Sequence, residues 1–173
     1  MTGRGRAIVL IGFMGAGKSS AGRALAQRTG YPRFDIDQLV SKQFHLLITE
    51  IFARFGEEKF RDGETEVLRQ LSGTTPAIIV TGGGIVLRRE NVELLRELGT
   101  IVHLQADEET LFHRISRRTH RPLLQTENPR QTLAELLQQR RPHYYEAADA
   151  ELDTSTLTHE EVVEGILKAI AEL

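Results

Sequence analysis

The 173-residue chain contains no cysteine, which excludes disulfides and thiolate metal sites. It also has no excess of either charge. The 22 basic and 24 acidic residues give a net charge of −2, so nothing argues for binding to nucleic acid or to a membrane surface. No apolar run approaches the roughly 18 residues that a membrane-spanning helix needs. There is no internal repeat and no low-complexity tract.

The composition that remains is ordinary for a globular protein, with 40% hydrophobic and 27% charged residues. The length is typical of one domain, so we expect residues 1–173 to form a single domain. Arg4 and Arg6 precede an apolar stretch, as in a signal peptide. That stretch breaks at Gly12, and Lys18 follows with no small-residue cleavage site before it. Together with the lack of cysteine, this favours a cytoplasmic protein.

Residues 12–19, GFMGAGKS, fit the pattern G-x-x-x-x-G-K-[ST]. They follow the apolar run 7–11, which predicts a buried strand, and they lead into a helical pattern. Glycines in such a turn let successive N–H groups point inward, and the helix dipole is aimed at the same place. Lys18 can then reach terminal phosphates, and the Ser19 hydroxyl can bind Mg²⁺. A flexible glycine turn is the alternative, but strand, loop and helix fall where a phosphate-binding loop requires them.

Apolar runs that predict strands alternate with helical patterns along the chain. The predicted strands cover 7–11, 33–36, 77–80, 100–104 and 151–154. The predicted helices cover 19–29, 39–71 with a break near Gly56, 89–98, 108–117, 133–148 and 160–173. This alternation indicates βαβ units, so we expect an α/β fold with a parallel sheet covered by helices on both faces. Residues 119–130 contain two prolines and few apolar residues, and they predict an exposed, mobile loop.

In such a sheet, ligands bind at the carboxyl ends of the strands. Asp35 and Asp37 end the second predicted strand, where side chains two residues apart face the same side. The two carboxylates repel each other unless a cation or a donor lies nearby, and a Mg²⁺ held by Ser19 would meet that need. One carboxylate could hold metal-bound water while the other accepts a proton from an alcohol. The alternative is that Asp37 caps the helix that follows, but beside a phosphate-binding loop we favour the site.

Glycines 82–84 follow the third predicted strand and expose backbone N–H groups that a ligand can approach closely, although a loose turn is the alternative. The other candidates are arginines, whose guanidinium groups suit phosphates and carboxylates. Arg121 lies in the predicted loop and Arg140 within or near a helix, and each alone is a weak signal. Arg61 lies three residues before Glu64 on a helix, a pattern equally typical of a solvated ion pair. The six histidines lack metal-ligand spacing, and we expect no role for them.

Taken together, these segments resemble shikimate kinase along almost the whole chain. The matching segments are GFMGAGKSS at 12–20, FDID at 34–37, FRDGE at 60–64, TGGG at 81–84, RPLL at 121–124 and RRPHY at 140–144. The resemblance implies a three-layer P-loop kinase fold, with a five-stranded parallel sheet between helices and a mobile lid at about 119–130. It implies ATP-dependent phosphorylation of the 3-hydroxyl of shikimate to shikimate 3-phosphate, in aromatic amino acid biosynthesis, with Mg²⁺ as cofactor. We expect a monomer whose partners are ATP and shikimate.

The resemblance also implies a role for each candidate residue. The ATP-binding set would be Gly15, Ala16, Gly17, Lys18, Ser19, Ser20, Arg114 near adenine, and Arg121 from the lid. The shikimate-binding set would be Asp37, Arg61, Gly82, Gly83, Gly84 and Arg140, with Gly83 the best single contact and with Phe52 and Phe60 as walls of the pocket. Mg²⁺ would be bound by Ser19, with Asp35 acting through water. The catalytic residues would be Lys18, Arg121 and Asp37, the last as candidate base.

Two other functions compete with this interpretation. Another small-molecule P-loop kinase, such as a gluconate kinase, would share Lys18 and Ser19 but would not need Arg61, Gly83 and Arg140. A non-catalytic ATP-binding regulator is the second alternative, and it fits poorly because the lysine, both aspartates and the lid arginine are all present. The segment 154–157 lacks the basic residues that some members of the family place near adenine, so the sequence leaves the adenine contact there open.

Overall fold

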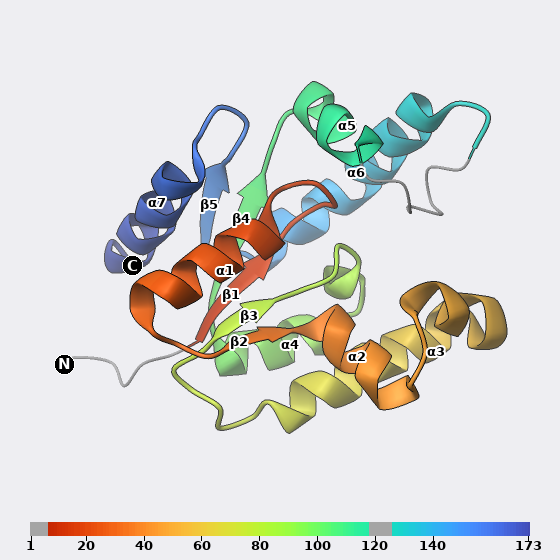
Figure 1. Ribbon diagram of the computed structural model, residues 1–173, viewed down its shortest axis with the longest axis horizontal. Coiled ribbons are helices and arrows are strands. Elements are labelled where there is room, and N and C mark those ends of the chain that lie inside the picture. The colour runs from red at the N-terminus through yellow and green to blue at the C-terminus, as the bar shows by residue number, and fades with distance from the viewer. Residues whose placement is uncertain (1–6, 118–125) are drawn as a thin grey trace.

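The computed structural model describes residues 7–117 and 126–173 (Figure 1). Its strands are β1 (Ala7–Ile11), β2 (Arg33–Asp35), β3 (Ile78–Val80), β4 (Gly99–Gln105) and β5 (Ala150–Asp153). Its helices are α1 (Lys18–Thr29), α2 (Ile36–Phe44), α3 (Ile48–Gln70), α4 (Arg89–Leu98), α5 (Glu108–Ser116), α6 (Pro129–Ala147) and α7 (His159–Ala171), with a short 3₁₀ helix, η1 (Ile85–Leu87). The predicted alternation of strands and helices is confirmed.

The strands form one parallel sheet in the order β2-β3-β1-β4-β5. β1 lies at its centre, where Leu10 faces Val80 of β3 on one side and Val102 of β4 on the other. Every residue of β1 and β3 is buried, which explains why both strands are continuous apolar runs rather than alternating ones. The strand order changes direction beside β1, and in parallel sheets this is the point where ligands bind.

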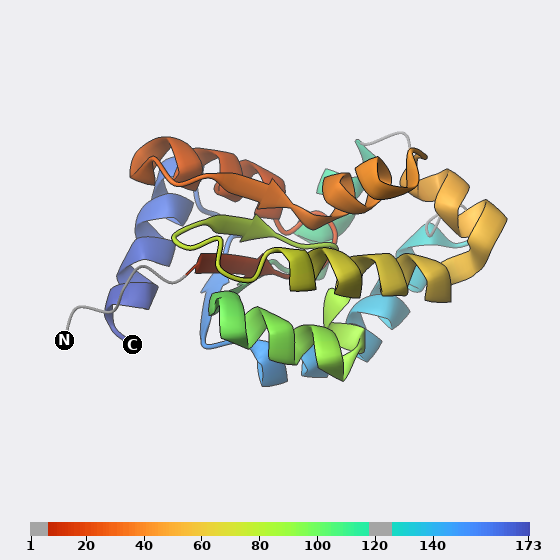
Figure 2. The same cartoon turned by 90° about the horizontal axis from the view of Figure 1, so that it is seen from below.

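Helices cover both faces of the sheet, so the fold has the three layers that the sequence predicts. In Figure 2, α1 lies above the sheet, and α4 and α6 lie below it. α7 packs against α1 and β5 at the far edge. α1 can approach β3 closely because of Gly22, where a Cβ would lie only 2.4 Å from Cγ2 of Val80. At the other end of the molecule, α2 and α3 pack on each other beyond the carboxyl ends of β2 and β3.

The predicted helix 39–71 is wrong in one respect, because it is two helices. α2 begins at Ile36, ends at Phe44 and is closed by His45. His45 has φ 54°, a left-handed conformation that usually calls for glycine, so its side chain gave no warning of the break. The predicted break at Gly56 is confirmed, since Gly56 has the non-helical angles φ 82° and ψ 173° inside α3.

α6 begins at Pro129, four residues before the predicted start at Leu133. Asn128 caps it by accepting a hydrogen bond from the N–H of Gln131 at 3.2 Å, and a proline in the first helical turn is itself a start signal. The predicted loop 119–130 therefore ends at Asn128, and its residues 119–125 lie outside the described ranges. Among the described residues, no helix is both long and apolar enough to cross a membrane.

Candidate active site

A cavity of about 390 Å³ lies at the carboxyl ends of the central strands. Three segments that are far apart in sequence line it: residues 14–21 from the loop after β1 and the first turn of α1, Asp37 at the start of α2, and Thr81–Gly83 after β3. Arg114 and Arg117 close its other side, together with Leu157 and His159. The phosphate-binding loop, one aspartate of the predicted pair and the glycine segment therefore meet as the sequence predicts.

The loop 12–17 has the geometry of an anion-binding turn. Gly12 has φ 145° and Gly17 has φ 97°, conformations that side-chain-bearing residues rarely adopt. Gly12 is doubly constrained, because a Cβ there would lie 2.2 Å from the carbonyl oxygen of Leu104. Gly17 precedes the first residue of α1, so the N–H groups of the first helical turn face the loop. No acidic side chain lies in that turn to oppose an anion.

Lys18 is the first residue of α1, and its buried side chain bends back over the loop. Its Nζ donates hydrogen bonds to the carbonyl oxygens of Gly12 at 2.6 Å and Phe13 at 2.9 Å. These bonds hold the ammonium group inside the curve of the loop. A cation fixed there lies where the phosphates of a bound nucleotide would be cradled.

Asp35 and Asp37 were predicted to lie on one strand with their side chains on the same side, and that prediction is wrong. β2 ends at Asp35, and Asp37 already belongs to α2. Asp35 is the residue that caps this helix: its Oδ1 accepts a hydrogen bond from the N–H of Gln38 at 3.3 Å, and its Oδ2 lies 3.4 Å from Nη1 of Arg33. The alternative in which Asp37 is the cap is therefore wrong. Asp37 lines the cavity instead.

The sequence left open whether Arg61 is a solvated residue on the surface of a helix, and the structure shows that it is not. It is only 7% exposed, and it is held from two sides by carboxylates of its own helix. Nη1 donates to Oε2 of Glu64 at 2.9 Å, and Nη2 donates to Oε1 of Glu57 at 2.8 Å. Glu57 is mostly exposed, whereas Glu64 is completely buried. Burial raises the pKa of Glu64 to about 7 and nearby Asp37 adds to the rise, although Arg61 opposes it.

The glycine segment after β3 makes room for the site's own side chains. A Cβ on Gly82 would lie 2.6 Å from Oδ1 of Asp37, and one on Gly84 would lie 2.3 Å from Nη2 of Arg61. Gly83 lies between them and beside Nη1 of Arg140, which would be 3.5 Å from a Cβ there. The sequence suggested that all three glycines allow a ligand to approach. That stays a prediction, and Gly82 and Gly84 are in addition needed to make room for Asp37 and Arg61.

Arg140 comes from α6, on the opposite side of the glycine segment from Arg61. It is 8% exposed, and its guanidinium lies over the ring of Phe13 at 5.8 Å from the centroid. The structure also brings together Phe52 and Phe60, the predicted walls, with ring centroids 4.8 Å apart. Two buried arginines therefore flank one short, side-chain-free segment, and the guanidinium of Arg61 also lies over the ring of Phe60, 5.5 Å from its centroid.

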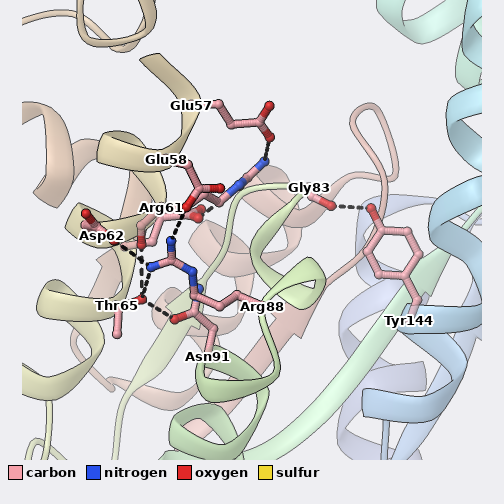
Figure 3. Close-up of polar contacts among 10 residues, drawn as sticks. Glu57, Glu58, Arg61, Asp62, Thr65, Gly83, Arg88, Asn91 and Tyr144 are labelled. Atoms are coloured by element: carbon pink, nitrogen blue, oxygen red, sulfur yellow. Dashed lines mark hydrogen bonds and ion pairs between the residues drawn. The ribbon is translucent and has the colours of Figure 1, made fainter. Parts of the chain in front are cut away.

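Arg88 holds the site's helix α3 against the segment that follows the glycines (Figure 3). Its Nη1 donates to Oδ1 of Asp62 at 2.9 Å and to Oγ1 of Thr65 at 3.2 Å, and its Nη2 donates to Oε2 of Glu58 at 3.0 Å. Thr65 in turn donates to Oδ1 of Asn91 at 2.6 Å. These contacts join α3 to the start of α4, so they limit how far Arg61 can move relative to Gly84.

On the nucleotide side, Arg114 connects the phosphate-binding loop to the end of β5. Its guanidinium donates to the carbonyl oxygen of Gly15 at 3.2 Å and to the carbonyl oxygen of Thr154 at 2.8 Å. Its predicted place near adenine stays a prediction. Arg117 and Glu64 are site residues that sequence reasoning missed, since a charged residue on a helix carries no sign of burial or of facing a cavity. Arg121, predicted to act from the lid, lies outside the described residues.

Hard oxygen ligands are present for a magnesium ion beside the phosphate-binding loop. The Ser19 side chain and the Asp37 carboxylate line the same cavity as the loop amides, and both are oxygen groups of the kind Mg²⁺ prefers. Within residues 7–117 and 126–173, no group of three or more histidine, cysteine, aspartate or glutamate side chains is arranged for a metal. A site with few protein ligands fits an ion whose other ligands are phosphate oxygens and water.

A glycine-rich loop between the central strand and α1 of such a sheet, beside a cavity lined by buried charge, defines a P-loop kinase. The family model described as "Shikimate kinase" matches residues 14–171. A curated shikimate kinase of Thermodesulfovibrio yellowstonii is 46% identical over 166 residues, which cover 96% of this chain and 95% of that protein. The chain belongs to the shikimate kinase family.

Solved structures agree with this assignment. A shikimate kinase from Acinetobacter baumannii in complex with shikimate has a TM-score of 0.91 and 36% identity, covering 96% of this chain and 93% of that one. A gluconokinase from Sinorhizobium meliloti 1021 has a TM-score of 0.60 and 19% identity, covering 97% and 93%. The second likeness shows the fold alone, so it lends no weight to the gluconate alternative.

Proposed function

We propose that the protein transfers the terminal phosphoryl group of ATP to the 3-hydroxyl of shikimate, giving ADP and shikimate 3-phosphate. The observation that carries this proposal is the convergence of Arg61, Arg140 and Asp37 on the glycine segment next to the phosphate-binding loop. Shikimate has one carboxylate and three hydroxyls. Two guanidinium groups and one carboxylate match that set in charge and in hydrogen-bonding capacity.

The carboxylate of shikimate is assigned to Arg61 and Arg140, which come from α3 and α6 on opposite sides of Gly83. Both are buried, so an ionic hydrogen bond to either is screened less than one at the surface. Glu57 and Glu64 already fix the plane of the Arg61 guanidinium. The substrate therefore meets an oriented group and loses little free energy in ordering it.

Asp37 is assigned to a ring hydroxyl and to its proton. Phosphoryl transfer depends mainly on positioning and on neutralising charge, and Asp37 lines the cavity that also contains Lys18. A Cβ on Gly82 would lie 3.3 Å from Oε1 of Glu64 as well as 2.6 Å from Oδ1 of Asp37, and burial raises the pKa of Glu64 to about 7. A protonated Glu64 lessens the repulsion on a charged Asp37, which preserves Asp37 as a proton acceptor.

The phosphates of ATP are assigned to the loop amides 15–20 and to Lys18. Ser19 would be the direct protein ligand for Mg²⁺, with Asp35 expected to act through water from the end of β2. Bound Mg²⁺ would neutralise charge on the phosphate oxygens. The ammonium group of Lys18, fixed by the carbonyls of Gly12 and Phe13, supplies positive charge from the protein itself.

The test is ADP release by the purified protein with ATP and Mg²⁺, compared with shikimate, with gluconate and with no acceptor. We expect release that depends on shikimate and stops when Mg²⁺ is removed by a chelator. Gluconate is the informative comparison, because it also offers a carboxylate and hydroxyls but lacks the ring. Equal rates with gluconate, or equal rates with no acceptor, would show that the proposed substrate is wrong.

A further inference from the structure

Tyr144 is a buried residue of α6 that contacts the glycine segment directly. Its side chain is only 1% exposed, and its hydroxyl donates a hydrogen bond to the carbonyl oxygen of Gly83 (Figure 3). Its ring stacks on that of His103 from β4, with centroids 5.0 Å apart and an angle of 26° between the planes. Packing alone would be satisfied by phenylalanine. A buried hydroxyl destabilises the fold unless it forms a hydrogen bond. The presence of tyrosine rather than phenylalanine therefore suggests that the bond to Gly83 has a function.

The conformation of the glycine segment depends on hydrogen bonds rather than on side chains: the carbonyl oxygens of Gly82 and Gly84 accept from the N–H groups of Ile85 and Leu87, and that of Gly83 accepts from Tyr144. Thr81 is fixed at its start, with its N–H and its Oγ1 both bonded to the carbonyl oxygen of Leu10. Gly82, Gly83 and Gly84 then follow with no side chains, and glycine has more backbone freedom than any other residue. Gly83 also lies against the phosphate-binding loop, since a Cβ there would be 3.5 Å from the amide nitrogen of Met14. A small rotation of its peptide would therefore change the space between loop and substrate.

A hydrogen bond to the Gly83 carbonyl fixes more than one atom. The peptide that joins Gly83 to Gly84 is planar and trans, so holding the carbonyl oxygen also sets the direction of the Gly84 N–H. Tyr144 lies one helical turn after Arg140, on the same side of α6. One short stretch of helix therefore sets both the guanidinium of Arg140 and the peptide beside it.

The contact is insensitive to pH across the neutral range. Burial raises the pKa of Tyr144 to about 12, so the hydroxyl keeps the proton it donates. Burial, with the nearby charges of Lys18 and Arg141, lowers the pKa of His103 to about 4, so the stacked imidazole is neutral. Neither ring therefore changes its charge near neutral pH.

We propose that Tyr144 is a positioning residue for the acceptor substrate: its hydroxyl holds the Gly83–Gly84 peptide in the orientation that binding of the hydroxy acid requires. The proposal rests on the proposed function, because it assumes that this segment binds shikimate. It assigns Tyr144 to the acceptor side alone. The residues that cradle the nucleotide belong to the loop after β1, which adjoins Gly83 but has its own hydrogen bonds from Lys18 to the carbonyl oxygens of Gly12 and Phe13.

The test compares Tyr144→Phe with Tyr145→Phe. Tyr145 is the matched control, since it is the next residue of α6, is 45% exposed and donates its hydroxyl to Gln105 at 3.1 Å. We expect Tyr144→Phe to raise the KM for shikimate about 5- to 30-fold, the equivalent of about 1–2 kcal/mol, because the buried Gly83 carbonyl loses its donor. The KM for ATP should stay within about twofold, and Tyr145→Phe should change neither constant.

Replacement of Tyr144 by 4-aminophenylalanine restores a donor at the same place and should recover most of the shikimate affinity. A shikimate KM within twofold of wild type for Tyr144→Phe, or equal increases for ATP and shikimate, would refute the positioning role. So would a Tyr144→Phe protein that fails to fold while Tyr145→Phe folds, because the hydroxyl would then serve folding rather than binding.

Hydrogen exchange separates this proposal from the proposed function. In the absence of any ligand, amide exchange over residues 81–87 should be faster in Tyr144→Phe than in Tyr145→Phe. Unchanged exchange would overturn the Tyr144 proposal even if shikimate is the substrate. The wild-type protein could fail to use shikimate while Tyr144→Phe still shows faster exchange. That result would refute shikimate as the substrate but would support the role of Tyr144 in ordering the glycine segment.

Discussion

Glutamine in place of Glu64 should make the protein relatively more stable as the pH rises. Glu64 is completely buried, and its pKa is raised from an ordinary value of 4.5 to about 7. Below pH 4.5 the carboxyl is protonated in both the folded and the unfolded chain. Between pH 4.5 and 7 the unfolded chain loses the proton while the folded one retains it, so the wild-type protein loses stability over this window.

The size of the effect follows from the shift. At about 1.4 kcal/mol per pH unit, the wild-type protein loses about 3 kcal/mol between pH 4.5 and 7.5 because of Glu64. Glu64→Gln has no proton to lose, so its stability relative to wild type should rise by about that amount. Whatever the amide costs in packing or in its contact with Arg61 is present at every pH, and it cancels from the comparison.

Urea unfolding of both proteins at half-unit steps from pH 4.5 to 7.5 measures this difference. Glu57→Gln is the matched control, because it removes the other carboxylate paired with Arg61 from an exposed position. We expect a rising stability difference for Glu64→Gln and a flat one for Glu57→Gln. A difference for Glu64→Gln that does not change with pH would refute the reasoning that burial keeps this carboxyl protonated.

Three substitutions test the remaining assignments. Lys18→Ala should lower kcat at least about 100-fold with little change in melting temperature, because the fixed ammonium neutralises charge on the transferring group; a kcat within threefold of wild type would exclude that role. Asp37→Asn should lower kcat about 10²- to 10⁴-fold and leave ATP affinity, measured by calorimetry, nearly unchanged; near-normal turnover would reduce Asp37 to a binding group. Gly84→Ala should raise the shikimate KM by at least about tenfold and leave the ATP KM unchanged. The new methyl carbon would lie 2.3 Å from Nη2 of Arg61, so the guanidinium has to move. An unchanged shikimate KM would contradict the position assigned to Arg61.

Much of the fold could be predicted because strands and helices carry strong local signals. β1 and β3 are continuous apolar runs, and the phosphate-binding loop has its glycines at fixed spacing. The break at His45 could not be predicted, because the left-handed conformation that closes α2 usually calls for glycine, and a histidine carries no such signal. The start of α6 was available from Asn128 and Pro129 and was missed.

The site was predictable in its residue types and less so in its geometry. Arg61 with Glu64 has the spacing of a surface ion pair, and only the fold shows that both are buried. Asp35 and Asp37 have strand spacing, but the helix begins between them, so one caps it and the other faces the cavity. Gly82 and Gly84 are glycines because of neighbours that come from α2 and α3, which no local pattern can reveal.

The non-helical residue Gly56 divides the acceptor side of the site into two parts with separate freedom to vary. The part of α3 before it carries the partly exposed Phe52, which we expect to form a wall of the pocket, and the part after it carries Arg61. Arg88 forms its hydrogen bonds with Glu58, Asp62 and Thr65, which all belong to the second part of α3. None of these three bonds involves the first part. Substitutions in residues 48–55 can therefore change the shape of the pocket around the substrate ring, while Arg61, which we propose binds the substrate carboxylate, keeps its position. For directed evolution toward other hydroxy acids, this short stretch is the place to diversify.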